Sequence, residues 1–301
     1  MPKNILITGA TGLIGRQLIP HLQKQGHTIS ILSRRRIAIQ GVTVFVWDIE
    51  KQTIEADALK GIDTVIHLAG ESIADKRWTA KRKAQIIDSR VKSAQLLYQT
   101  IKETNTPIKT FISASAVGYY GDRRDEFLWE NSGPGKGFLA KCCVKWEDAA
   151  DMGLEMGIRV VKVRVGLVLS KKDGALLAIA KPIKFFVGAP LGSGRQWMPW
   201  VHIDDVVGIF TKAVEDEAII GAYNAAAPYP VTNKLLTKRI AWRLSRPVWP
   251  LHVPKAVLKV ILGEASIMAL MSSNTAAQKI LDAGYQFKYL DLDEALKEIY
   301  G

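Results

Sequence analysis

Three glycines between a short strand and a helix constrain this chain more than any other feature. Residues 4–8 form an apolar run rich in β-branched side chains, and Gly9, Gly12 and Gly15 follow it before apolar residues recur at helical spacing. In such a turn the first glycine permits the tight bend, the second lets the backbone approach a pyrophosphate, and the third lets helix and strand pack closely. The free N–H groups and the positive dipole end of the helix attract phosphates.

The turn therefore predicts a dinucleotide site, and a plain tight turn would not need three glycines at this spacing. We expect cofactor contacts from Gly9, Thr11, Gly12, Leu13, Ile14 and Gly15. The end of the second strand selects the cofactor, because a carboxylate there holds the ribose of NAD and an arginine accommodates the 2′-phosphate of NADP. Ser33 and Arg34 stand there without a carboxylate, which favours NADP(H). The following Arg35 and Arg36 could equally form a solvated basic loop.

The alternation of strands and helices predicts the fold class. Strands are expected at 28–32, 42–47, 62–68, 108–113 and 158–169, with helices at 79–102 and 137–152. This order indicates an α/β protein with a doubly wound, mostly parallel, Rossmann-like sheet. After residue 170 prolines punctuate shorter elements, and helices are expected at 235–245 and 255–262. We therefore expect a nucleotide-binding domain at 1–230 and a smaller α-rich C-terminal lobe at 231–301, with room for the chain to cross between them.

Composition excludes several classes of protein. No run of 18 apolar residues occurs, and the first strand leaves no room for a signal peptide, so we expect a cytoplasmic protein without a membrane partner. The adjacent Cys142 and Cys143 are expected to be reduced helix residues, although a strained redox bridge is an alternative. No metal site is expected, since no histidine pairs with a second ligand at a metal-binding spacing. The chain is expected to be a monomer or a homodimer.

The net charge of +12 is the one unusual total. Seven basic residues lie between Lys76 and Lys92, as they would on a nucleic-acid surface. No nucleic-acid motif accompanies them, so attraction of an anionic substrate or cofactor explains the charge as well, and a solvated helix face explains much of it. Nucleic acid is therefore not expected as a partner.

Several motifs together resemble one family of enzymes. The chain is similar to the extended, atypical short-chain dehydrogenase/reductases, and more closely to their uncharacterised epimerase-family branch with a small C-terminal domain of unknown function. The resemblance runs almost end to end and rests on Thr8-Gly-Ala-Thr-Gly-Leu-Ile-Gly15, His67-Leu-Ala-Gly-Glu71, Ser113-Ala-Ser-Ala-Val-Gly-Tyr-Tyr-Gly121, Gly192-Ser-Gly-Arg-Gln196, Trp200-Val-His-Ile-Asp-Asp205, Tyr223-Asn224 and Ala283-Gly-Tyr-Gln-Phe287. Residues 272–276 depart from the branch, which usually has a Gly-Gln stretch and a proline there. The sequence therefore does not determine at which residue the next helix begins.

The resemblance implies a set of site residues. It places Leu68, Ala69 and Gly70 along the cofactor and Asp48 near the adenine, although Asp48 could instead cap a turn. It also implies that Ser115 contacts the substrate carbonyl and that Tyr119 could reach the site, and we take both as candidate catalytic residues. Glu71 and Lys141 are further candidates, with ordinary surface or ion-pair roles as their alternatives.

The usual acid/base pair of the family is absent from its expected place. Members carry Tyr-x-x-x-Lys on one helix, followed by a glutamate four residues later. Glu147 fits that glutamate, which puts Cys143 at the lysine position and Leu139 at the tyrosine position. A second such spacing, Tyr98 to Lys102, lies late in the long helix and is expected to be structural.

Two arginines are expected to face inward. Arg90 lies on the apolar stripe of the 79–102 helix, where it could hold a cofactor phosphate or form an ion pair with Glu71 or Asp88. Gln85 lies one turn earlier and is grouped with it as a cofactor contact. Arg164 in an apolar strand needs either the cofactor or a buried carboxylate. His202 is expected to be structural.

These features support two main hypotheses. The first is an NADP(H)-binding oxidoreductase or epimerase that acts on an unidentified carbonyl or hydroxyl substrate, anionic or similar to a nucleotide sugar, with another group in place of the Tyr-x-x-x-Lys pair. The second is a non-catalytic NADP(H)-binding regulator that senses redox ratio, which the loss of the pair favours.

Overall fold

A large twisted sheet organises the molecule, and the computed structural model describes residues 1–301. Its strand order is β12-β8-β6-β5-β1-β2-β3-β4, and every pairing is parallel except that of β3 with β4. Apart from the short β4, this is the strand order of a dinucleotide-binding sheet, in which the direction of winding reverses beside β1. The strands are β1 (Asn4–Thr8), β2 (Thr28–Ser33), β3 (Val42–Asp48), β4 (Thr53–Ile54), β5 (Thr64–His67), β6 (Thr110–Ala116), β8 (Arg159–Val165) and β12 (Gly221–Ala225).

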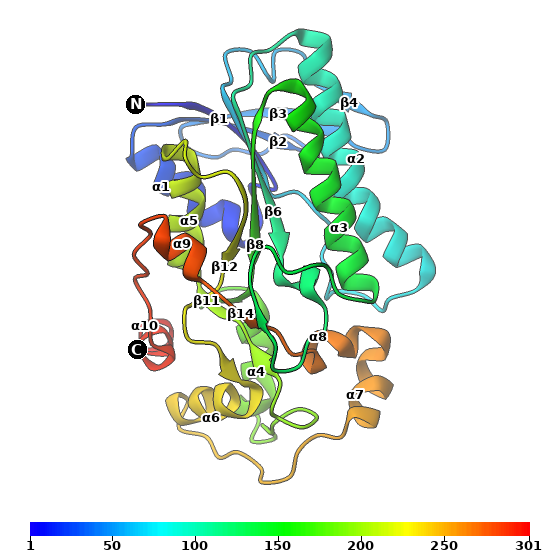
Figure 1. Cartoon of the computed structure of the whole chain (residues 1–301), viewed down its shortest axis with the longest axis vertical. Coiled ribbons are helices and arrows are strands. Elements are labelled where there is room, and N and C mark those ends of the chain that lie inside the picture. The colour runs from blue at the N-terminus through cyan, green and yellow to red at the C-terminus, as the bar shows by residue number, and fades with distance from the viewer.

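Helices cover both faces of this sheet (Figure 1). On one face α1 (Leu13–Lys24) packs against α5 (Ile203–Glu215), and on the other α2 (Ala80–Thr104) packs against α3 (Phe138–Asp151). Neighbouring residues of β1 divide between the two layers, since Ile5 and Ile7 enter the core under α1 and α5 while Leu6 enters the core under α2. Successive side chains of a strand point to opposite faces, so the sheet has a core on each side. The predicted doubly wound α/β fold is therefore confirmed.

A smaller lobe lies beyond one end of the sheet. It contains the helices α4 (Ala175–Lys184), α6 (Asn233–Arg243), α7 (Lys255–Leu262) and α8 (Ile267–Leu270) and the short strands β9 (Leu167–Leu169), β10 (Trp197–Met198), β11 (Trp200–His202) and β13 (Val231–Thr232). The remaining elements are β7 (Phe127–Leu128), β14 (Asn274–Thr275), α9 (Gln278–Asp282), α10 (Leu292–Tyr300) and three 3-10 helices at Val117–Tyr120, Met152–Met156 and Gly263–Ser266. We call the part that contains α4, α6, α7 and α8 and the strands β9, β10, β11 and β13 the small lobe.

The end of the chain returns from the small lobe to the large sheet. Strand β14 pairs with β7, α9 contacts β12, and α10 packs against α6. Tyr285 and the backbone N–H groups of Lys288 and Tyr289 all donate to the buried Asp205 carboxylate on α5. The chain therefore crosses between the lobes more than once, and a domain boundary at residue 230 stays a prediction.

One predicted strand was wrong in its length. The apolar run 158–169 forms two strands, β8 and β9, which belong to different sheets. They part at Gly166, where a Cβ atom would lie 2.1 Å from the carbonyl oxygen of Pro199. Leu167 N–H donates to that same carbonyl, and β9 then pairs with β11. The close approach to a distant segment breaks the strand, and hydrophobicity alone does not record it.

Two local expectations are settled by hydrogen bonds. His202 caps α5 by accepting from Asp204 N–H, and it also contacts Glu298, so its role is structural. The atypical 272–276 stretch contains the two-residue strand β14, and the Ser272 hydroxyl donates to Arg124 O and accepts from Trp197 N–H. The serine hydroxyls hold this stretch extended, and helix α9 begins only after it, without a side-chain cap.

Candidate functional site

The glycine turn adopts a backbone that only small residues permit. Gly9 has φ +68°, and a Cβ atom there would lie 2.6 Å from the carbonyl carbon of Leu68. A Cβ atom on Gly15 would lie 2.6 Å from Ala10 O. Gly12 is the N-cap of α1, so Leu13 and Ile14 form the first turn, whose N–H groups have no partner inside the helix. The turn thus brings β1 against the end of β5 and leaves backbone donors at the start of α1.

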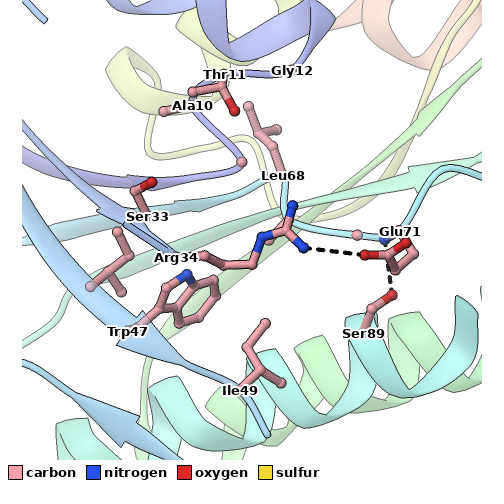
Figure 2. Close-up of a pocket in the computed structure, with 14 residues that line it drawn as sticks. Ala10, Thr11, Gly12, Ser33, Arg34, Trp47, Ile49, Leu68, Glu71 and Ser89 are labelled. Carbon is pink, nitrogen blue, oxygen red and sulfur yellow. Dashed lines mark hydrogen bonds and ion pairs between the residues drawn. The ribbon is translucent and has the colours of Figure 1, made fainter. Parts of the chain in front are cut away.

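A cavity of about 220 Å³ opens between this turn and the carboxyl ends of the neighbouring strands (Figure 2). Its walls come from the glycine turn, from the ends of β2 and β3, from the loop after β5 and from α2. The lining residues are Gly9, Ala10, Thr11, Gly12, Leu32, Ser33, Arg34, Trp47, Ile49, Leu68, Ala69, Gly70, Glu71 and Ser89. This is the crevice in which open α/β sheets bind their ligands.

The structure brings together most of the residues expected at the cofactor. Gly9, Thr11, Gly12, Ser33, Arg34, Leu68, Ala69 and Gly70 all line the cavity. Leu13, Ile14 and Gly15 lie just behind it in α1, and Gln85 is exposed on α2 and does not line it. Sequence reasoning missed Trp47 and Ile49, which flank Asp48. Asp48 itself accepts from the N–H groups of Glu50 and Lys51, so it caps a turn.

Arg34 lies across the cavity toward Glu71, and Figure 2 shows this contact. The Arg34 Nη1 atom is 3.5 Å from Glu71 Oε1, and the buried Arg82 holds the other oxygen of Glu71 at 2.9 Å. The Arg34 side chain is 81% exposed. An exposed ion pair of this kind contributes little free energy, so Arg34 can exchange the carboxylate for another anion at small cost.

Arg90 supports the loop that follows β5 from behind. Its Nη1 atom donates to the carbonyl oxygens of Glu71 (3.1 Å) and Ile86 (2.8 Å), and its guanidinium lies 4.7 Å from the Trp146 ring centre. A Cβ atom on Gly70 would lie 2.9 Å from Arg90 Cζ. Burial lowers the pKa of Arg90. The expected carboxylate pairs are not formed, because Glu71 pairs with Arg82 and Asp88 pairs with Lys92.

Below the cavity lies a buried group that we call the pocket floor: Thr8, His67 and Ser93. Thr8 and His67 are partners in the register of β1 and β5. Thr8 Oγ1 accepts from the N–H groups of Leu68 and Ala69 and lies 2.8 Å from His67 Nδ1, to which it must therefore donate. Ser93 Oγ donates to backbone carbonyls of α2 and lies 3.1 Å from His67 Nε2.

This hydrogen bonding fixes the state of His67. Nδ1 accepts and Nε2 carries the proton, so the ring is neutral. Burial lowers its pKa to about 4. The pocket floor thereby holds the Leu68–Ala69 backbone against the cavity. A polar residue at the last position of two adjacent apolar strands is the sequence signal that could have identified this pair.

A second buried group, which we call the ion-pair centre, consists of Ser115, Glu147 and Arg164. Arg164 Nε and Nη2 bond the two oxygens of Glu147, each at 2.8 Å, and Ser115 Oγ donates to Glu147 at 2.7 Å. Arg164 Nη1 donates to Tyr120 Oη and to Glu130 O. The buried carboxylate engages Arg164, and Arg164 does not line the cavity, so its expected contact with the cofactor stays a prediction.

The candidate catalytic residues lie at this centre and away from the cavity. Ser115 is buried with its proton committed to Glu147, so its role as a substrate contact stays a prediction. Tyr119 is half-buried, with its ring centre 3.6 Å from Arg164 Cζ, while its neighbour Tyr120 donates to Asn224. Tyr119 and Tyr120 thus enclose the ion pair of Arg164 and Glu147. The Tyr119 hydroxyl lies outside the hydrogen bonds of the ion-pair centre.

Helix α3 carries apolar groups where the family's acid/base pair would stand. Leu139 and Cys143 are buried, and burial raises the pKa of the Cys143 thiol to about 12. Both cysteines are free. Tyr98, the alternative tyrosine, donates to Ala150 O at 2.6 Å from a buried position, in agreement with a structural role. Neither helix therefore presents an ionisable phenol beside the cavity.

No cluster of three or more histidine, cysteine, aspartate or glutamate residues is arranged to hold a metal ion. None of the helices combines the length and the apolar character needed to cross a membrane.

Comparison with known proteins places these features in a family. Residues 5–226 match the model of the NAD dependent epimerase/dehydratase family, and residues 253–299 match a domain of unknown function, DUF1731. The chain is 38% identical over 299 residues to the epimerase family protein YfhF of Bacillus subtilis (strain 168), covering 98% of this chain and 97% of that protein.

Two solved structures are similar across the whole chain. The human epimerase family protein SDR39U1 (isoform 2), crystallised with NADPH, has a TM-score of 0.88 and 31% identity, with 99% of both chains covered. A nucleoside-diphosphate sugar epimerase from Corynebacterium glutamicum has a TM-score of 0.81 and 34% identity, and the match covers 100% of this chain and 59% of that one.

Proposed function

The chain belongs to the NAD dependent epimerase/dehydratase family, and from that premise we propose that it binds NADP(H) and acts as an oxidoreductase or epimerase. Its substrate would be a carbonyl or hydroxyl compound that is anionic or similar to a nucleotide sugar. The observation that carries the proposal is the cavity at the glycine turn, with Arg34 on its wall and no carboxylate at the end of β2. The NADPH in the human relative's structure supports the choice of cofactor.

The residues present fit such a dinucleotide. A Cβ atom on Gly9 or Gly15 would clash with backbone, as expected where the turn must stay small, and the first turn of α1 offers unpartnered N–H groups to phosphates. Arg34 would exchange Glu71 for the 2′-phosphate, with Ser33 beside it. Trp47 and Ile49 offer an apolar wall for the adenine. Leu68 to Gly70 would lie along the rest of the cofactor, and bound NADP(H) would supply or accept a hydride.

The protein's own part in the chemistry would differ from that of short-chain dehydrogenase/reductases that carry the Tyr-x-x-x-Lys pair. With Leu139 and Cys143 on α3, no phenol–ammonium pair is available to move a proton. The Tyr119 hydroxyl, which lies outside the hydrogen bonds of the ion-pair centre, is the group we propose for that role. Arg90 would act as a positioning residue, because it holds the Glu71 carbonyl behind the Gly70 backbone.

The first test is cofactor binding by fluorescence titration of Arg34→Ala, with Arg35→Ala as the matched control. A charge-assisted hydrogen bond to phosphate contributes about 1.5–3 kcal/mol, so NADPH affinity should fall about 10- to 100-fold. NADH affinity should change little in Arg34→Ala, and Arg35→Ala should bind both cofactors as the wild type does. Equal losses for NADPH and NADH would mean that Arg34 supports the loop and does not read the phosphate.

A second candidate function is a non-catalytic NADP(H)-binding regulator. The observation that favours it is the apolar pair Leu139 and Cys143 at the acid/base positions. Such a protein would bind NADPH and NADP with different affinities and would need no substrate. Challenging the NADPH complex with carbonyl metabolites and nucleotide sugars separates the two. Oxidation of NADPH that Tyr119→Phe reduces at least tenfold supports the enzyme, while cofactor binding without turnover across the set supports the regulator.

A further inference from the structure

The positive charge of the molecule is concentrated in the small lobe. Two segments, 174–203 and 218–263, contain ten lysine and arginine residues and no aspartate or glutamate. The rest of the chain holds 31 basic and 29 acidic residues and is nearly neutral. These segments include α4, α6 and α7 and the loops that join them. The net charge of +12 is therefore a local property, and an anionic cofactor in the distant cavity does not account for it.

The same segments expose large apolar side chains, and five of them lie in two loops that contact each other. Phe185, Phe186 and Val187 follow α4 and are 53–69% exposed. Trp249 and Leu251, in the loop between α6 and α7, are 54% and 76% exposed. Figure 1 shows this loop at the end of the molecule's long axis that lies away from the N-terminus. We call these five residues the tip surface.

Hydrogen bonds join the two loops into one rigid surface. Trp249 Nε1 donates to Phe186 O at 2.7 Å, and Trp249 N–H donates to Gly188 O at 2.9 Å. The Arg246 guanidinium lies 4.7 Å from the Phe186 ring centre. The loop backbone is thus satisfied within the protein while the side chains face solvent. An exposed cluster of this size and composition is typical of an interaction site.

The chemistry of the tip surface favours one kind of partner. Lys181 and Lys184 lie in the last turn of α4, Arg243 ends α6 and Arg246 follows it, with no acidic residue in either segment. A second copy of this chain would bring like charges together. Nucleic acid would use the cations and aromatic rings but offers nothing to the aliphatic Val187 and Leu251. An anionic lipid surface can bind the aromatic rings, the aliphatic side chains and the cations together. Aromatic rings lie at the headgroups, aliphatic groups enter the acyl boundary and cations pair with phosphates.

We propose that the tip surface docks the protein peripherally on an anionic phospholipid bilayer. Phe185, Phe186, Val187, Trp249 and Leu251 enter the interfacial layer, and the surrounding lysines and arginines bind lipid phosphates. The sequence-based expectation of no membrane partner rested on the lack of a spanning segment, which peripheral docking does not require. The docking surface lies apart from the cofactor cavity, so both can be occupied together.

The test is co-sedimentation of the full chain with vesicles of phosphatidylcholine, with or without phosphatidylglycerol as one third of the lipid. The wild type should bind the anionic vesicles and leave the neutral ones unbound, and binding should weaken as salt rises. The double variant Phe185→Ser/Leu251→Ser should lower the vesicle affinity at least tenfold. Leu154→Ser changes an apolar residue on the large lobe that is 54% exposed and should bind as the wild type does.

Two double variants with the same change in net charge distinguish an effect of the position of the lysines from an effect of net charge. Lys181→Glu/Lys184→Glu should lower the affinity at least tenfold, whereas Lys60→Glu/Lys102→Glu, with the same change in net charge on the large lobe, should lower it less than twofold. Equal losses in both pairs would overturn the proposal, as would absence of binding by the wild type. A dimer that Phe185→Ser/Leu251→Ser dissociates, without vesicle binding, would assign the surface to a second copy instead. Unchanged NADPH binding and melting temperature establish that the variants are folded.

Discussion

The pocket floor and the ion-pair centre both lie near the carboxyl edge of the sheet, yet they use buried polar residues in opposite ways. The pocket floor is neutral, and its hydrogen bonds through Thr8 leave the backbone of residues 68–70 facing an open cavity. The ion-pair centre is charged, and Arg164 and Glu147 bond each other and their neighbours. The difference teaches that buried polar residues at strand ends build a ligand site only where their hydrogen bonds leave neighbouring backbone or side-chain groups facing an open cavity.

The largest expected effect comes from breaking the ion-pair centre. Glu147→Leu would leave the Arg164 guanidinium buried without its carboxylate, which costs about 3–5 kcal/mol of unfolding free energy. Urea denaturation measures the loss. Glu155→Leu, at an exposed acidic position after α3, should change stability by less than about 0.5 kcal/mol. A small loss in Glu147→Leu would mean that solvent reaches Arg164, and the contrast between the two regions would disappear.

The pocket floor should respond to pH in a way the ion-pair centre does not. Because burial lowers the pKa of His67 from 6.5 to about 4, the unfolded chain binds a proton at His67 that the folded chain excludes. Its contribution is therefore complete above pH 6.5 and is lost as the pH falls toward 4, by about 3 kcal/mol in all. The stability difference between wild type and His67→Gln should shrink over that window in denaturant titrations at stepped pH. A difference that stays constant from pH 7 to 4 would contradict a buried neutral ring.

The smallest effect concerns the C-terminal end of α2. Tyr98→Phe removes the hydrogen bond to Ala150 O and should cost about 1 kcal/mol of unfolding free energy while leaving NADPH affinity unchanged. Lys102→Met, four residues later, should change neither quantity, because Lys102 is exposed. Loss of cofactor binding in either variant would show that this Tyr-x-x-x-Lys spacing takes part in the site.

Much of the fold could be predicted because its signals are local. The glycine turn, the alternation of strands and helices and the bounds of α2, α3 and α7 depend on residues close together in the chain. Arg34 was predicted to contact the cofactor because it follows the second strand, whose end selects between NAD and NADP, and it does line the cavity. The break at Gly166 could not be predicted, since it depends on Pro199, which meets it only in the folded chain.

The candidate site shows the same division. Arg164 was recognised as a residue that needs a partner, but the choice between cofactor and carboxylate awaited Glu147, which reaches it from α3. Arg90 was placed on the inward face of its helix, yet its partners proved to be backbone carbonyls and the Trp146 ring. Trp47 and Ile49 look like ordinary strand-end residues until β3 is placed beside the cavity.

The sequence by itself determined where the chain turns, which residues enter the core and which strand end carries Arg34, because these follow from conformational preference and periodicity over a few residues. Only the tertiary structure decided which buried charges pair, which hydroxyls are engaged in hydrogen bonds and which apolar side chains remain exposed to solvent. Those outcomes depend on groups far apart in sequence that compete for the same partners, and burial makes each pairing exclusive.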